Sequence, residues 1–215
     1  MKPYGATMKT TTDSTYRGYP INTGRKNEFP CNELTLDQII DRQEYMTRNH
    51  SKVLFTRLDI RSPGDSATSL REKMPRILET AGRKLKAGHN GKNRLELHHV
   101  WAAEQTEAGG KEHVHLALWA NGNAIQNGYS LKSALESALE RHLGTGNKGG
   151  SKGLVEFCSS NGRTGIMLDR NAPDFEQKRY DSIYRASYLA KTSTKEHKAK
   201  GARFSSASRL PSDRR

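Results

Sequence analysis

The sequence contains few cysteines and no long run of apolar residues. Cys31 and Cys158 are the only cysteines among 215 residues, and their wide separation argues against a disulfide scaffold or a cysteine zinc site. No stretch approaches the roughly 20 apolar residues of a membrane span. The first residues also lack the apolar core of a signal peptide, so we expect a cytoplasmic protein with no membrane partner.

Acidic residues are also scarce relative to basic ones. The chain has 36 Lys and Arg against 23 Asp and Glu, a formal net charge of +13. Such an excess favours a polyanionic partner, with nucleic acid as the first candidate. An anionic membrane is a weaker candidate, because no strongly basic amphipathic helix stands out. A merely solvated basic surface is the alternative.

The two ends of the chain differ from its middle. Residues 1–32 are rich in Thr, Gly, Asn and Pro without periodicity, which predicts a flexible N-terminal arm. Residues 193–215 are basic, Ser-rich and almost free of apolar residues, which predicts a disordered tail. Residues 33–192 then form the single domain. Hydrophobic residues make up 33% of the chain, which suffices for one core.

Hydrophobic periodicity predicts nine elements in this domain. Helices are expected at 35–50 with Thr35 as N-cap, at 66–87 with a break or kink at Pro75, at 130–143, and at 174–192. Strands are expected at 52–61, 95–103, 113–119, 154–158 and 166–168, the last two as a pair. The order of these elements predicts an α+β fold with a mostly antiparallel sheet and helices against one face.

Two histidines in an apolar strand are the first candidate for chemistry. His113 and His115 are two residues apart, so both imidazoles lie on one face of the strand and could bind one cation. Such a pair alone is more often an ordinary hydrogen-bonded one. The preceding strand should form a hairpin with this one and bring Glu104 beside the histidines. Two imidazoles and a carboxylate with open positions suit Mg²⁺ or Mn²⁺ acting on a phosphate, although Glu104 could also be a surface carboxylate at a hairpin end.

A row of tyrosines in the last helix is the second candidate. Tyr180, Tyr184 and Tyr188 repeat every four residues, and Lys191 follows three residues later. Positions four apart share one helical face. An aromatic core stripe is the alternative, but three hydroxyl groups would each need a hydrogen-bond partner if buried.

The two motifs together resemble a known family. His113-Val-His115 in an apolar strand, followed by Tyr184-Arg-Ala-Ser-Tyr188-Leu-Ala-Lys191, resembles the HUH endonucleases that initiate rolling-circle replication, in their two-tyrosine branch. Residues 100–105 and the overall length are most similar to the inovirus-type replication proteins of phages and prophages. The resemblance extends from about Leu36 to Lys191. Tyr180 lies outside the pattern and is expected to pack or to stack on DNA.

The resemblance implies an HUH, RRM-like palm and site-specific nicking and joining of single-stranded or hairpin DNA at an origin. Tyr184 or Tyr188 would form a 5′-phosphotyrosyl bond, Lys191 would hold a phosphate oxygen or the phenolate, and His113, His115 and Glu104 would hold the cation. Host helicase and polymerase would be partners in the cytoplasm of a bacterial host. Three alternatives stay open: a non-catalytic nucleic-acid-binding module, a single-tyrosine relaxase-like or transposase-like enzyme using Tyr188, and a metal-dependent hydrolase using water.

Overall fold

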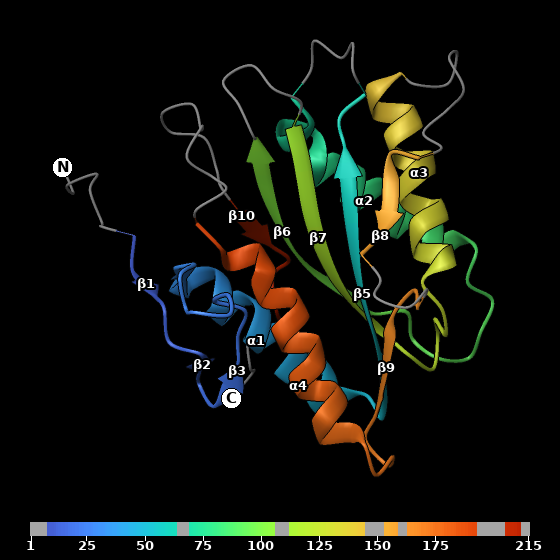
Figure 1. The fold of residues 1–215 in the computed structure, drawn as a ribbon. Helices are drawn as coiled ribbons and strands as arrows, with labels where there is room; N and C mark the ends of the chain where they lie inside the picture. Colours follow the sequence, from blue (N-terminus) through green and yellow to red (C-terminus); the bar gives the residue numbers. More distant parts are fainter. Residues whose placement is uncertain are drawn as a thin grey trace, which may run out of the picture.

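Strand β5 (Lys52–Arg61) is an interior strand of the antiparallel sheet around which the chain folds (Figure 1). The computed structural model describes residues 8–63, 69–105, 112–144, 153–158, 163–192 and 205–211. In these residues the sheet order is β10 (Ser205–Ala207), β6 (Leu97–Gln105), β7 (Glu112–Asn121), β5 and β8 (Val155–Phe157). β9 (Ile166–Asp169) pairs with the same edge of β5 as β8, at the other end of the strand. The predicted α+β fold with a mostly antiparallel sheet is confirmed.

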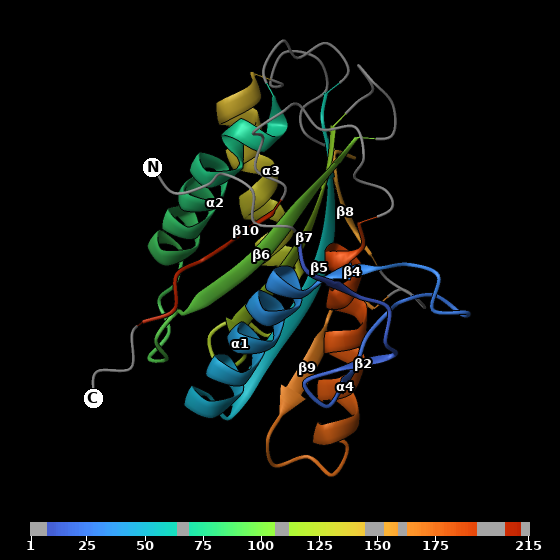
Figure 2. The same ribbon diagram turned by 90° about the vertical axis from the view of Figure 1, so that its left-hand side faces the viewer.

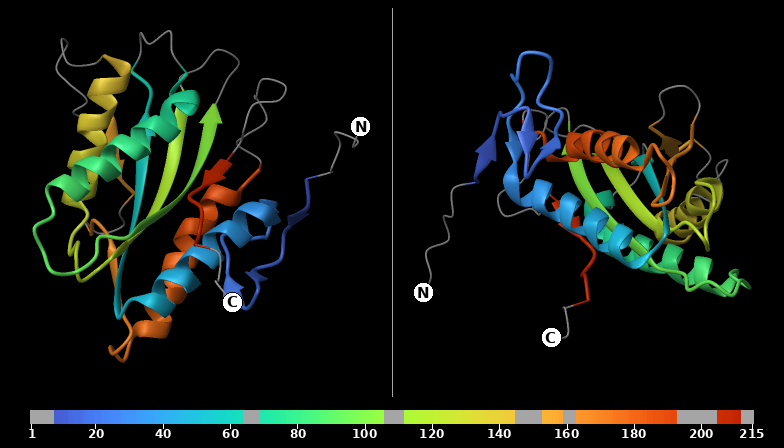
Figure 3. Two further views of the ribbon diagram at one scale, coloured as in Figure 1. Left: turned by 180° about the vertical axis from the view of Figure 1, so that it is seen from behind. Right: turned by 90° about the horizontal axis from the view of Figure 1, so that it is seen from below.

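Helices cover both faces of the sheet. Alternate residues of β5 point to opposite sides: Leu54 and Leu58 pack with α2 (Leu70–Ala87) and α3 (Tyr129–Leu143). Val53 and Phe55 pack with α1 (Glu33–Asn49) and α4 (Phe175–Ala186). Figures 2 and 3 show α2 and α4 on opposite sides of the strands. The prediction of helices against one face was therefore wrong, because long apolar strands such as β5 are buried on both sides.

The helix ends follow from local capping chemistry. The Asn32 side chain, not Thr35, caps α1 by accepting a hydrogen bond from the Thr35 amide at 2.8 Å. α3 ends at Leu143 as predicted, and its C-cap is Gly144, whose φ of +66° is a left-handed conformation that favours glycine. α2 continues through Pro75 without the predicted break, and the missing N–H of this proline removes a single backbone hydrogen bond of the helix. The predicted start of α2 at 66 lies outside the described residues.

The described part of the N-terminal segment, residues 8–32, is not a free arm. It forms β1 (Thr10–Thr11), β2 (Thr15–Tyr16), β3 (Tyr19–Pro20) and β4 (Cys31–Asn32). Tyr19, Ile21 and Cys31 are buried against α1 and α4. Strands of two residues are too short to show hydrophobic periodicity, so the sequence pattern missed this layer. Residues 1–7 lie outside the described part.

Part of the C-terminal tail is likewise ordered. β10 pairs antiparallel with β6, with Ser206 opposite Trp101. The edge of a sheet offers unpaired backbone groups, and even a serine-rich segment can form hydrogen bonds with them. This pairing depends on the backbone and not on composition, so the composition of this segment wrongly predicted disorder. Residues 193–204 and 212–215 lie outside the described part. β8 and β9 also differ from the prediction, since each pairs with β5 instead of with the other.

None of the helices in the described residues is both long and apolar enough to cross a lipid bilayer.

Candidate metal and tyrosine site

The register of three strands brings the candidate ligands together. His115 on β7 lies opposite Asp59 on β5 and opposite Ala102 on β6. His113, two residues earlier, lies opposite Glu104. Directly opposite residues share a face of the sheet. The two histidines, Asp59 and Glu104 therefore all project toward the face that α1 and α4 cover.

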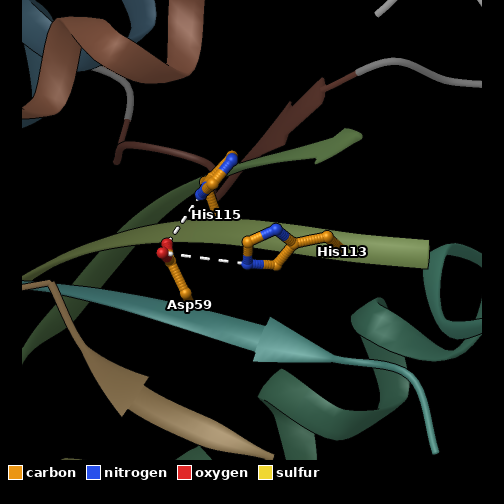
Figure 4. Close-up of side chains that lie close together, drawn as sticks. All are labelled: Asp59, His113 and His115. Carbon is orange, nitrogen blue, oxygen red and sulfur yellow. Dashed lines mark hydrogen bonds and ion pairs between the residues drawn. The ribbon is translucent and has the colours of Figure 1, made fainter. Parts of the chain in front are cut away.

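Asp59, His113 and His115 form a compact cluster (Figure 4). One potential ligand atom from each residue lies within 4.8 Å of the other two. His115 Nδ1 lies 2.6 Å from Asp59 Oδ1, and His113 Nε2 lies 3.7 Å from Asp59 Oδ2. In Figure 4 the carboxylate of Asp59, on β5, points toward both imidazole rings of β7. Two imidazoles and one carboxylate are a donor set suited to a divalent transition metal such as Mn²⁺.

Glu104 lies on the other side of the His115 ring. Its Oε2 is 2.6 Å from His115 Nε2, and its side chain is almost fully buried. The position in the cluster that we expected for Glu104 is occupied by Asp59. Metal-bound histidines commonly donate their second N–H to a carboxylate, which orients the ring. Glu104 is in the right place to orient His115 in this way.

Protonation differs between the two histidines. Burial disfavours the charged ring of His115, but its hydrogen bonds with Asp59 and Glu104 outweigh burial and raise the pKa above 6.5. Burial and the neighbouring His115 lower the pKa of His113 below 6.5. His113 therefore carries a neutral ring, the form that binds a metal.

The environment of His113 Nε2 favours a cation between His113 and Asp59. This nitrogen is buried and has no hydrogen-bond partner among the described residues, an arrangement that is normally unfavourable. Two atoms that bind one ion at about 2.1 Å lie at most about 4.2 Å apart, so the 3.7 Å separation from Asp59 fits a shared ion. The residues therefore fit a divalent cation.

Asp59 is held in its ionised form. Burial alone would raise its pKa, but hydrogen bonds from His115 and the Cys158 thiol, with the charge of Arg57, lower it to about 2. Burial raises the pKa of Cys158 to about 12, so its sulfur stays a protonated thiol. An ionised carboxylate beside a neutral thiol favours a hard or borderline cation bound through oxygen and nitrogen.

Tyr188 contacts this cluster directly. Its ring meets the His115 ring edge to face, with centroids 5.0 Å apart, and the Arg57 guanidinium lies 4.3 Å from the Tyr188 ring centroid. Burial, with the charges of Glu104 and Asp59, raises the Tyr188 pKa, while Arg57 lowers it. Tyr188 lies in the 3-10 helix Ser187–Ala190 that continues α4.

Lys191 follows on the same side. It is only 8% exposed, and its ammonium lies 5.2 Å from the Tyr188 ring centroid and 4.3 Å from that of Phe29. Burial lowers the pKa of Lys191. The backbone of Lys191 forms a bridge with Cys31. The N-terminal segment therefore helps to position this lysine near Tyr188.

The other two tyrosines point elsewhere. Tyr184 is 44% exposed and lines a cavity between β9 and α4 with residues such as Arg163 and Lys178. Tyr180 packs edge to face on Tyr19 of the N-terminal segment, with ring centroids 5.9 Å apart. Of the three tyrosines in the predicted row, Tyr188 is thus the one in contact with His115, and Tyr180 packs as expected.

Sequence reasoning missed Asp59 and Arg57. Both alternate with buried apolar residues in β5 and share the face of Val53 and Phe55. Two charged residues on the buried face of an otherwise apolar strand were the available signal. Their partners are more than 50 residues away, so no local spacing could identify them.

Comparison with known proteins gives one match. The family model described as YagK/YfjJ C-terminal domain matches residues 11–207. No curated protein and no solved structure matches the chain. The matched range includes Asp59, His113, His115, Tyr188 and Lys191, together with β10 and the N-terminal layer from residue 11 onward.

Proposed function

The chain belongs to the YagK/YfjJ C-terminal domain family, and we propose that it is a metal-dependent enzyme that nicks and joins single-stranded DNA at a replication origin. The proposal follows the resemblance to the HUH endonucleases. The observation that carries it is the contact between Tyr188 and His115, whose ring also meets the carboxylate of Asp59. A tyrosine nucleophile beside a cation site matches the needs of phosphodiester transesterification.

Asp59, His113 and His115 would hold Mg²⁺ or Mn²⁺, with Glu104 orienting His115. When bound, the cation polarises a phosphate oxygen and offsets the negative charge of the transition state. The carboxylate of Asp59 favours these hard cations. The reaction would take place in the cytoplasm of a bacterial host, where origin DNA, helicase and polymerase meet.

Tyr188 would act as the nucleophile. Its hydroxyl oxygen attacks phosphorus in line, the P–O3′ bond breaks, and the 3′ oxygen leaves with the electron pair and takes up a proton. The products are a 5′-phosphotyrosyl bond and a free 3′-hydroxyl. Joining is the reverse attack of a 3′-hydroxyl, which restores one phosphodiester for one phosphotyrosyl bond and needs no ATP.

Two positively charged side chains support the attack by Tyr188. A buried phenol is a poor nucleophile because burial raises its pKa, and the phenol proton must leave before attack. Arg57 lies 4.3 Å from the Tyr188 ring centroid and opposes that rise. Lys191 would stabilise the phenolate or a non-bridging phosphate oxygen.

The role of Tyr184 separates two versions of this proposal. In the two-tyrosine version Tyr184 attacks the regenerated junction after one round of replication. In the single-tyrosine version Tyr188 carries out both steps. The 44% exposure of Tyr184 and its position in the cavity beside β9 favour the single-tyrosine version.

The test is a covalent-adduct assay. The protein is incubated with Mn²⁺ and 5′- or 3′-labelled single-stranded DNA spanning the origin of its own genetic element, followed by a denaturing gel. We expect a slower protein band that carries only the DNA 3′ of the nick. EDTA and Tyr188→Phe should abolish the band, and Tyr184→Phe should retain it.

Other outcomes point to other functions. Cleaved DNA without an adduct would replace tyrosine attack by hydrolysis with water. Binding without cleavage on a verified origin would favour a non-catalytic DNA-binding module. Retention of the adduct in Tyr188→Phe and its loss in Tyr184→Phe would assign the first attack to Tyr184.

A further inference from the structure

A cavity of about 570 Å³ lies between β9 and α4, next to the candidate site. Figure 1 shows these two elements side by side. Its volume is in the range of roughly 300–1,000 Å³ typical of small-ligand sites. In its single-tyrosine version the function proposed above does not use this cavity, so the lining is considered by itself.

The cavity is predominantly basic. Arg163, Lys178 and Arg185 line it against one acidic residue, Asp181. Lys178 forms an ion pair with Asp174 at 2.9 Å, and Arg163 is exposed on the opposite wall. Even with Lys178 paired to Asp174, Arg163 and Arg185 outnumber Asp181, and a concave surface with an excess of positive charge attracts a polyanion. Phosphate groups of a nucleic acid are such a ligand.

An exposed aromatic ring accompanies these cations. Tyr184 is 44% exposed although it is a large side chain on a packed helix. Proteins that bind single strands without duplex pairing combine a basic groove with aromatic rings on which bases stack. In duplex DNA the base faces are already stacked, so this combination favours a single strand.

The cavity shares a wall with the candidate site. Arg185 lines the cavity, and its guanidinium donates a hydrogen bond to the carbonyl of Cys158, the residue whose thiol contacts Asp59. Arg57 donates to the Arg185 carbonyl at 3.4 Å and also lies over the Tyr188 ring. Tyr184 precedes Tyr188 by four residues, about 6 Å along a helix. A strand that reaches Tyr188 can therefore continue into the cavity.

We propose that this cavity binds a nucleotide of single-stranded DNA next to the cleaved phosphate, with Tyr184 stacking on its base. Arg163 and Lys178 contact the backbone phosphates. The inference rests on the proposed nicking function for the identity of the strand. It assigns Tyr184 to substrate binding, so the aromatic ring matters and the hydroxyl does not.

The first experiment measures binding without chemistry. All variants carry Tyr188→Phe and are titrated against fluorescein-labelled oligothymidylate in EDTA, with fluorescence anisotropy as the readout. Tyr184→Ala should weaken binding by about 5- to 150-fold, the range for one stacked base. Tyr184→Phe should bind as tightly as the parent. Tyr129→Ala, which removes an exposed tyrosine from α3 on the opposite face, is the matched control and should have no effect.

The second experiment tests the phosphate contacts. The slope of log affinity against log salt should lose about 0.7 for each phosphate contact removed from a single strand. Arg163→Ala/Lys178→Ala should therefore flatten the slope by about 1.4. Arg76→Ala/Lys84→Ala removes two exposed cations of α2 and should leave the slope unchanged. Equal thermal unfolding midpoints would exclude misfolding as the cause.

The outcomes separate this inference from the function on which it rests. Unchanged binding in Tyr184→Ala, or an equal loss in Tyr184→Phe, overturns the stacking role even if the wild-type protein nicks DNA. A loss confined to Tyr184→Ala and to the double cavity variant supports the site even if no nick is found. Tighter binding of oligouridylate or of duplex DNA than of oligothymidylate would overturn the choice of single-stranded DNA.

Discussion

His115 Nδ1 lies 2.6 Å from the carboxylate of Asp59, which is 56 residues earlier in the chain. The antiparallel register of β5 and β7 places the two residues directly opposite each other. The other ring nitrogen of His115 meets Glu104 at the same distance. His115 is thus fixed from both sides, and only its Nδ1 faces the Asp59–His113 cluster.

Mn²⁺ binding should depend on this cluster. We expect isothermal titration calorimetry to show one site per chain in the wild-type protein. Asp59→Ala and His113→Ala each remove a ligand and should weaken binding by at least about tenfold. Glu104→Gln removes the carboxylate that orients His115 and should weaken binding by about 10- to 100-fold. His142→Ala on α3 is the control, since His142 contacts Thr80 instead. Equal affinities of the wild-type protein and the variants of Asp59, His113 and Glu104 would contradict the site.

The same binding should depend on pH. A cation must displace the proton that His115 holds between two carboxylates, and the pKa of that ring is raised above 6.5. Affinity should therefore fall as the pH decreases through this raised value, by up to about tenfold per pH unit. Glu104→Gln removes one charge that raises the pKa, so its decline should begin at a lower pH. An unshifted profile in that variant would be inconsistent with this account of His115.

Gln43 should stabilise the attachment of α4 to the sheet. Its fully buried amide oxygen accepts hydrogen bonds from Trp119 Nε1 at 3.1 Å and Ser182 Oγ at 2.7 Å. Gln43→Leu leaves the indole N–H without this acceptor, so we expect a loss of about 1–3 kcal/mol in the free energy of unfolding. Urea denaturation measures it. Gln177→Leu, on the exposed side of α4, should change stability by less than about 0.5 kcal/mol.

Removal of the N-terminal segment should unfold or strongly destabilise the protein. A chain that begins at Glu33 loses the Asn32 cap and the buried side chains of Tyr19, Ile21 and Cys31. Each fully buried apolar side chain contributes roughly 1.5–3 kcal/mol. Thermal unfolding followed by circular dichroism should show a much lower midpoint or no transition. A truncated chain as stable as the full one would mean that this layer is dispensable.

Patterns with a short repeat were readable from the sequence. The short apolar run 113–119 identified β7, and the period of two of a strand placed both histidines on one face. The hairpin with β6 follows from a short connection. The period of about 3.6 identified α1, α3 and α4. These periods reflect the local backbone geometry of strands and helices, so a single sequence is enough to show them.

The composition of the site depended on contacts between distant segments. The register between the strands places Asp59 in the cluster and Glu104 on the other side of His115. Tyr184 and Tyr188 look equivalent in sequence but occupy different surroundings, since the N-terminal layer, β9 and the sheet surround different parts of α4 and its 3-10 extension.

The amino-acid sequence alone thus places the two histidines on one strand face, spaces the tyrosines four residues apart and shows the excess of positive charge. That Asp59 joins His113 and His115, and that Tyr188 is the tyrosine in contact with His115, follows from the folded chain. The physical reason is that local periodicity determines which face a side chain occupies. Its neighbours on that face depend on the packing of strands and helices that are far apart in the chain.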